Sequence, residues 1–260
     1  MLKKNYYKII IIVILIILLN LIFSYFFSGI IIPFVNTKKK KSTEVVIAHY
    51  KEDLSWVDKY IPKEFKVYIY TKSDQKPNCK REYVHKYLDN VGRCDHTYLY
   101  HIHSKYGDNN LAENIIFLPG GCDMLLPFPK KLYLLFTLLN NGVFDFYCPN
   151  LNYHFYPEVT DYLMEDLVRN GYCSSHQKNR HKDCTINKFK FDNIQEWLDY
   201  FDLKKIKYIS FTGIFSIKSK IIYRRSKSFY EKMIKHMDYA DSTLNGHFLE
   251  RSWYTIFNPN

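Results

Sequence analysis

The polar turn at residues 90–93, Asn-Val-Gly-Arg, combines residue types that suit a phosphate group. Gly92 can adopt a positive φ or let the backbone approach a ligand closely. Arg93 supplies a forked, permanently charged donor for phosphate or carboxylate. Asp95 is a good N-cap for the helix that we expect next, and the free N–H groups at a helix start suit an anion. The alternative is a purely structural turn before a buried helix.

A second candidate follows the apolar strand predicted at residues 115–118. This strand leads into the sequence Pro-Gly-Gly-Cys-Asp, which ends at Asp123. Ligands of open α/β sheets bind at the carboxyl ends of strands. At Asp123 a divalent cation, manganese or magnesium, could bridge a diphosphate and stabilise its departure. Only one acidic residue is present rather than an Asp-x-Asp pair, so the alternative is a loop aspartate that caps a turn.

Glu250 is the candidate general base. It lies in a helix predicted over residues 246–257, and from there it could point into a cleft and accept a proton from a hydroxyl. An ion pair with Arg251 or a nearby lysine is the alternative.

Four possible metal ligands lie in one basic loop, namely Cys173, His176, His181 and Cys184. Tetrahedral zinc accepts such mixtures of cysteine and histidine, but the spacing matches no common zinc finger. A disulfide between the two cysteines would suit an oxidising compartment. A pair of free thiols is the third interpretation.

These residues need a scaffold, and the order of the elements predicts one. Short apolar strands are predicted at residues 44–50, 65–70, 115–118, 144–148 and 207–212. Helices are predicted at residues 51–60, after Asp95, and at residues 128–140, 159–169, 193–201, 224–237 and 246–257. Residues 76–89 are predicted to form a polar loop, and residues 214–222 to be extended. Strand, helix and strand in this order predict an α/β fold with a mostly parallel central sheet flanked by helices.

Two helices have a predicted inner face. In the helix after Asp95, residues at helical spacing indicate packing against the core, namely Tyr98, Leu99, Ile102 and Tyr106. In the helix at residues 128–140, the predicted inward residues are Leu132, Leu135, Phe136 and Leu139. His101 and His103 are interpreted as surface or packing histidines, whereas His96 lies near the predicted ligand.

The N-terminal region predicts a membrane anchor. Residues 1–8 form a short tail with three lysines, and residues 9–32 are almost wholly apolar. About 20 apolar residues suffice to span a bilayer. A cleaved signal peptide is the rival, but no convincing cleavage site follows. Residues 33–43 are the predicted stem, and residues 44–260 are long enough for one domain with a substantial core.

Composition narrows the functional class. The chain has 260 residues with 24 Tyr and 19 Phe, which excludes a disordered protein. Its formal net charge of +11 suits anionic partners such as membrane headgroups or nucleotide diphosphates. Nucleic-acid binding would rest on charge alone, because no recognised motif is present, and we do not expect it. Signatures of serine hydrolases, zinc proteases, P-loop enzymes and dinucleotide folds are absent.

An ordered set of short motifs resembles a known family. The motifs are VIAHYKEDLSW at residues 46–56, NVGR at 90–93, HTYLYHI at 96–102, IFL at 116–118, FTGIFSI at 211–217 and LERSWYTIF at 249–257. Together they resemble domain-of-unknown-function family 3431, which looks like a distant relative of the GT-A glycosyltransferases. The resemblance covers nearly the whole chain after the stem. Asp95 departs from it, because the family more often has Glu at this point.

The resemblance implies a Rossmann-like GT-A fold and a role for particular residues. His49, Tyr50 and Asp53 would hold the nucleoside of a nucleotide-sugar donor. The sugar diphosphate would contact Asn90, Gly92, Arg93 and Asp95, with His96 nearby. Thr212 and Gly213 would face the acceptor together with Trp253, and Glu250 would lie near the reacting hydroxyl.

The resulting functional prediction is a membrane-anchored transferase that moves a sugar from a nucleotide donor to a hydroxyl of a glycan, protein or lipid. The alternative is a catalytically inactive anchored domain of the same fold that binds a glycan or acts as a scaffold. In either case the resemblance implies a single-pass protein of an endomembrane of the ER or Golgi type, with the C-terminal domain lumenal.

Overall fold

The computed structural model describes residues 42–107, 110–125, 129–149, 151–153, 191–210, 212–238 and 245–258. Five sequence predictions lie outside these residues: the tail at residues 1–8, the anchor at residues 9–32, nearly all of the stem, the helix at 159–169, and the loop with Cys173, His176, His181 and Cys184. Among the described residues, no helix is both long enough and apolar enough to cross a bilayer.

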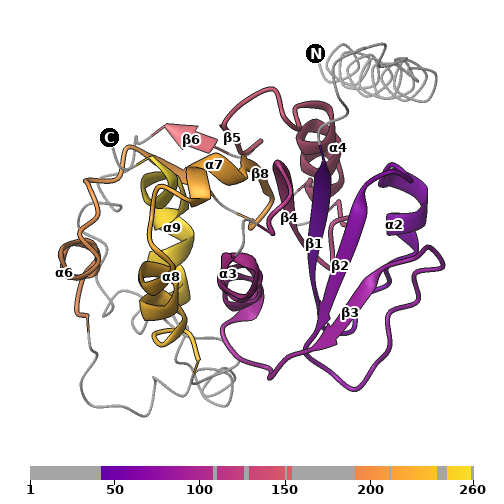
Figure 1. The fold of residues 1–260 in the computed structure, drawn as a ribbon, viewed down its shortest axis with the longest axis horizontal. Helices are drawn as coiled ribbons and strands as arrows, with labels where there is room; N and C mark the ends of the chain where they lie inside the picture. The colour runs from indigo at the N-terminus through magenta and orange to yellow at the C-terminus, as the bar shows by residue number, and fades with distance from the viewer. Residues whose placement is uncertain are drawn as a thin grey trace, which may run out of the picture. The chain divides into compact units, whose positions relative to one another are not determined.

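A mixed sheet forms the centre of the domain (Figure 1). Within the described chain its six strands run in the order β3-β2-β1-β4-β8-β5. The strands are β3 (Val84–Tyr87), β2 (Lys66–Thr71), β1 (Thr43–His49), β4 (Asn114–Pro119), β8 (Phe215–Lys218) and β5 (Phe146–Tyr147). The first four strands are parallel to one another, whereas β8 is antiparallel to both β4 and β5. The predicted α/β class and mostly parallel sheet are therefore confirmed.

A second, two-stranded sheet pairs β6 (Leu151–Tyr153) with β7 (Tyr208–Ser210). In the sequence β6 follows β5, and β8 follows β7, so consecutive strands connect this small sheet to the β5–β8 side of the central one.

Both faces of the sheet are covered, which explains why its central strands are continuous apolar runs rather than alternating ones. Every residue of β1 is buried. Val46 and Ala48 belong to the core cluster on the side of α3 (Arg93–Lys105). Val45 and Ile47 belong to the other cluster, which includes residues of α2 (Ser55–Tyr60) and α4 (Lys130–Leu139).

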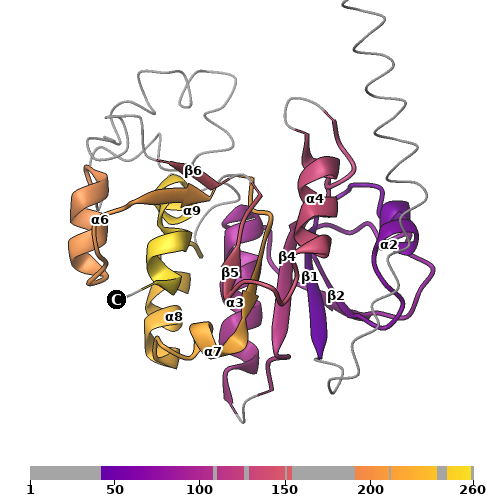
Figure 2. The ribbon, with the colours of Figure 1, turned by 90° about the horizontal axis from the view of Figure 1, so that it is seen from above.

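The remaining helices lie on the α3 side. In both views α3 is between the sheet and the pair α8 (Lys227–Ile234) and α9 (Asn245–Phe257), with α6 (Ile194–Tyr200) outermost (Figures 1 and 2). The short α7 (Ser219–Ile222) follows β8 directly. As predicted, Tyr98, Leu99 and Ile102 of α3 are fully buried.

Several predicted boundaries are wrong. Strand β3 lies inside the stretch predicted as a loop, because it is an edge strand of mixed polarity and gives no apolar signal. The helix predicted from residue 51 begins only at Ser55. Residues 219–222 are helical rather than extended. The strand predicted at residues 144–148 contains only Phe146–Tyr147.

The predicted inner face of α4 is also wrong. The fully buried residues of this helix are Leu134 and Thr137. The predicted residues Leu132, Leu135 and Phe136 are only partly buried, and Leu139 is 41% exposed. The helix is apolar at almost every position, so the spacing of its leucines could not decide which side faces the sheet.

Candidate anion-binding site

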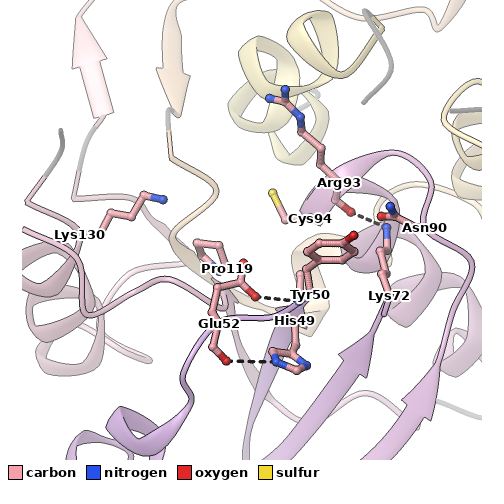
Figure 3. A pocket seen from close by; sticks show the side chains of 10 residues that line it. His49, Tyr50, Glu52, Lys72, Asn90, Arg93, Cys94, Pro119 and Lys130 are labelled. Atoms are coloured by element: carbon pink, nitrogen blue, oxygen red, sulfur yellow. Dashed lines mark hydrogen bonds between the residues drawn. The ribbon is translucent and has the colours of Figure 1, made fainter. Parts of the chain in front are cut away.

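A pocket of about 500 Å³ opens at the carboxyl ends of β1 and β4 and beside the start of α3 (Figure 3). This is the edge of an open α/β sheet at which ligands bind. The volume lies within the range of small-molecule sites. The lining residues are Ala48, His49, Tyr50, Glu52, Lys72, Asn90, Arg93, Cys94, Pro119 and Lys130.

The loop after β1 is held by the carboxylate of Glu52. One of its oxygens, Oε2, accepts hydrogen bonds from the backbone N–H of Tyr50 at 2.7 Å and of Lys51 at 3.1 Å. The Tyr50 carbonyl also accepts a hydrogen bond from the Ser73 hydroxyl. The backbone on both sides of Tyr50 is thereby fixed, while its ring, 44% exposed, stands at the pocket (Figure 3).

The hydrogen bonds of His49 define its tautomer. Its Nε2 is 3.2 Å from the carbonyl of Glu52, which can only accept, so Nε2 carries the proton. Burial lowers the pKa of His49, so the ring is neutral and Nδ1 is an acceptor. Nδ1 is 3.1 Å from the Thr71 hydroxyl, which therefore donates to it. The hydroxyl in turn accepts from Nε2 of His85 at 2.9 Å.

Both ring nitrogens of His49 are therefore engaged with the protein. Its contribution to the pocket is to position the loop after β1 rather than to offer a free nitrogen to a ligand.

The start of α3 forms the opposite wall of the pocket. Gly92 caps the helix with a φ of 58°, the positive φ that the sequence analysis allows for this glycine, and Arg93 follows with a φ of 47°. The ammonium group of Lys72 donates to the carbonyls of Val91 and Arg93. Lys72 is almost fully buried, and burial lowers its pKa to about 8. A buried cation thus holds the turn that begins the helix.

Arg93 and Lys130 add two further cations. Figure 3 shows the Arg93 side chain extending away from the start of α3 toward the C-terminal helical region. The pKa of Glu250 on α9 is raised by burial and lowered most by the neighbouring Arg251 charge, then by the Thr212 N–H, and to a smaller extent by the charges of Arg93 and Lys130. Burial is the largest of these influences, so that pKa lies above its ordinary value. Glu250 therefore adjoins the pocket, although it is not among the lining residues.

The predicted role of Asp95 as N-cap is wrong. The helix begins earlier, with Gly92 at the cap position and no side-chain cap bond. Asp95 lies in the first turn and is buried, and its Oδ1 accepts a hydrogen bond from the Trp253 indole at 2.8 Å. Burial, followed by the nearby Glu250 carboxylate, raises the pKa of Asp95 to about 7. Trp253 is fully buried and packs against Phe257 and Phe215.

The turn between β7 and β8 adjoins Glu250. Thr212 has φ 75° and Gly213 has φ 65°, and a positive φ is unusual for a β-branched residue. The Thr212 N–H donates to Oε1 of Glu250 at 3.1 Å, and the Tyr98 hydroxyl donates to the Gly213 carbonyl at 2.8 Å. The turn thus fixes one oxygen of Glu250.

The structure brings four of the predicted donor residues to one pocket: His49, Tyr50, Asn90 and Arg93. A second group lies behind the start of α3, namely Asp95, Thr212, Gly213, Glu250 and Trp253, linked through the contacts described above.

Gly92 caps α3 without lining the pocket, and three other candidates also lie outside the lining. Asp53 accepts hydrogen bonds from Ser55 and Asn78 at the start of α2. His96 is buried, its pKa is lowered to about 4 by burial, and its Nε2 is 3.8 Å from Asp238. Asp123 is exposed, four residues beyond the end of β4.

Sequence reasoning missed Glu52, Lys72, Cys94 and Lys130 as pocket residues. Lys72 directly follows the buried strand β2, and this position could have predicted that it lies at the ligand-binding edge of the sheet. Glu52 and Lys130 enter the pocket through tertiary packing, for which the sequence holds no local signal.

The described residues contain no set of side chains that would form a metal centre. No three His, Cys, Asp or Glu side chains there are grouped as metal ligands, and the exposed Asp123 lies outside the pocket lining.

Comparison with known proteins returned no protein-family model, no curated protein and no solved structure that matches the chain. The resemblance to family 3431 stays a prediction.

Proposed function

We propose that the pocket binds the diphosphate of a nucleotide sugar and that the chain is a glycosyltransferase of GT-A type. The observation that carries this proposal is the charge of the pocket lining. Three cations, Lys72, Arg93 and Lys130, line it with a single carboxylate, Glu52, whose Oε2 is already bound to two backbone N–H groups. An anionic ligand is the partner that such a lining favours.

The start of α3 supports the same ligand. The N–H groups of a helix's first turn lack intrahelical partners and carry the positive end of the helix dipole. Here the first i to i−4 bond joins the His96 N–H to the Gly92 carbonyl, so the N–H groups of Arg93, Cys94 and Asp95 precede it. Backbone donors beside a cluster of cations form a typical phosphate site.

In the proposed reaction a hydroxyl oxygen of the acceptor forms a bond to the anomeric carbon of the sugar. The bond from that carbon to the diphosphate oxygen breaks, and the diphosphate leaves with the electron pair. Arg93 and Lys130 would stabilise the charge that develops on it. Glu250 would accept the proton of the hydroxyl, and a carboxylate with a raised pKa is a stronger base for this task.

Binding of a nucleoside diphosphate tests the proposal. Calorimetry with uridine, guanosine and adenosine diphosphates should find at least one that binds, and Arg93→Ala should weaken it about tenfold or more through loss of a charge-assisted contact. Lys235→Ala is the matched control, because it removes one positive charge from an exposed ion pair with Glu231 on α8. Absence of binding by all three, or equal weakening by both variants, would contradict the proposal.

A catalytically inactive binding or scaffold domain is the second candidate. The position of Asp123 outside the pocket lining, without the paired aspartates that would hold a metal, favours it. Sugar transfer or donor hydrolysis by the full chain, measured with and without manganese, separates the two candidates. Binding without turnover in both conditions would support the second.

A further inference from the structure

The outer surface of α4 and the turn that follows it is apolar and exposed. Leu139 is 41% exposed, Val143 is 59% exposed and Phe144 is 50% exposed. Leu132, Leu135 and Phe136, on the same outer side of the helix, are only partly buried. At the other end of α4, the Lys131 N–H donates to the Met124 carbonyl at 3.2 Å, and Met124 and Leu125 are 45% and 64% exposed.

We group these exposed or partly buried apolar side chains of α4 and its flanking segments as the α4 strip: Met124, Leu125, Leu132, Leu135, Phe136, Leu139, Val143 and Phe144. Exposed apolar residues scattered singly are ordinary, but a run along a helix and both of its flanking loops indicates a surface that is covered in the functional state.

The position of the α4 strip identifies what covers it. The side-chain amide of Asn141, at the end of α4, donates to the Thr43 hydroxyl at 3.2 Å. Thr43 is the first residue of β1, and the chain reaches it directly from the stem. The end of the strip therefore lies beside the point where the stem enters the domain.

The stem is short. Residues 33–42 can span at most about 35 Å when fully extended. The apolar residues 9–32 that precede them are long enough to cross a bilayer. Thr43, and with it the end of the α4 strip, is thus tethered within a short distance of any membrane that holds this segment.

We propose that the α4 strip is a membrane-docking surface, with Leu139, Val143 and Phe144 entering the interface between headgroups and acyl chains. Amphipathic helices bind bilayers through a buried apolar face aided by basic residues. The helix α4 begins at Lys130. Lys130 also lines the pocket, and the opposite end of α4 lies ~15 Å away, which is the length of this helix. Docking of the strip therefore holds the edge of the pocket at about this distance from the point where the stem enters the domain.

Tryptophan fluorescence of the full chain in vesicles tests this docking. The protein is reconstituted in vesicles of phosphatidylcholine and phosphatidylserine, with and without bromine on the lipid acyl chains. The native tryptophans are all buried, with Trp56 at 3% exposure and Trp197 and Trp253 at 0%. The emission added by Val143→Trp or Phe144→Trp should be strongly quenched by brominated lipid. Val143→Trp is included because Val143 is well exposed, so the test can still be made if the Phe144→Trp variant does not fold.

Tyr200→Trp is the matched control. Tyr200 is 39% exposed and lies on α6, on the other side of the sheet from α4 (Figure 2). Its added emission should not be quenched. Quenching at neither α4 site, equal quenching at all three sites, or failure of the protein to float with the vesicles would overturn the proposal. A blue shift at Val143→Trp without lipid quenching would assign the strip to a second copy instead. None of these outcomes depends on the pocket binding a nucleotide.

Discussion

The indole Nε1 of Trp253 donates a hydrogen bond to the carboxyl of Asp95 at 2.8 Å, across 158 residues of sequence. This contact joins α9 to the first turn of α3 and holds an acidic group inside the core. Glu250, one turn away from Trp253 on the same helix, adds a second carboxyl whose charge raises the pKa of Asp95. The wall behind the pocket therefore contains two acids, and the charge of Glu250 disfavours the ionisation of Asp95.

This arrangement predicts the pH dependence of stability. Asp95 has a folded pKa of about 7 against an ordinary value of 3.8, so the folded protein binds a proton more tightly than the unfolded chain. The resulting stability is fully present below pH 3.8 and is lost as the pH rises to 7. Asp95→Asn keeps an acceptor for Trp253 but removes this titration. We expect the variant to gain stability relative to the wild type, by up to a few kcal/mol, between these pH values.

Urea unfolding of the detergent-solubilised chain at several pH values measures the effect. Asp145→Asn is the control, because the pKa of Asp145 is lowered by Lys218 and Lys220. Its stability contribution is lost only as the pH falls below the ordinary range of a carboxyl, so the Asp145 difference should be nearly flat over the same window. A flat difference for Asp95→Asn as well would contradict the expectation.

A second prediction concerns the stability and ligand binding of a Gly92→Ala variant. Its φ of +58° disfavours any side chain, and a Cβ there would lie 2.7 Å from the Met237 carbonyl oxygen. Gly92→Ala should cost at least about 1–2 kcal/mol of unfolding free energy. It should also weaken diphosphate binding, because it displaces the turn that presents Arg93. Gly107→Ala is the control, since a Cβ at Gly107 meets no atom within 4 Å. Equal effects of the two substitutions on unfolding would show that the Gly92 turn is not strained.

The sequence predicted the parts of this site that depend on local chemistry. Gly92 and Arg93 were recognised because a left-handed turn before an aromatic helix has a local signature, and β1 and β4 because long apolar runs need burial on both faces. The inner face of α4 was missed because its leucines occupy more than one side of the helix. Glu52 and the pairing of Asp95 with Trp253 were missed because each depends on packing between distant segments.

Lys72 predicts a pH dependence of ligand binding. Burial lowers its pKa to about 8, and an anionic ligand favours the protonated form. Affinity for a nucleoside diphosphate should therefore fall as the pH rises through 8, with uptake of a proton on binding near that pH. Lys72→Met should bind more weakly and lose this pH dependence. Calorimetry in two buffers of different ionisation enthalpy measures the proton uptake, and an unchanged profile in Lys72→Met would exclude Lys72 as its source.

The last prediction concerns Thr71, whose replacement by valine should lower the free energy of unfolding although the volume of the side chain is kept. Its hydroxyl is fully buried, donates to His49 and accepts from His85. Thr71→Val keeps the shape of the side chain and removes both hydrogen bonds. Because the buried Nδ1 of His49 is left without its donor, we expect a loss of about 1–3 kcal/mol in the free energy of unfolding.

Thr137→Val is the matched comparison for Thr71→Val. Thr137 is also fully buried, but its hydroxyl donates to the Tyr133 carbonyl one turn earlier in α4. In an α-helix that carbonyl also accepts the backbone N–H of the residue four positions later, so removal of the hydroxyl leaves no partner unsatisfied. Urea unfolding of both variants should show the larger loss for Thr71→Val. Thr71→Val should also loosen the loop after β1, because His49 donates to the Glu52 carbonyl in that loop. Diphosphate binding should therefore be weaker in Thr71→Val and unchanged in Thr137→Val. Equal stability losses together with unchanged binding would mean that the hydrogen-bonded chain from His85 to His49 does not position the pocket.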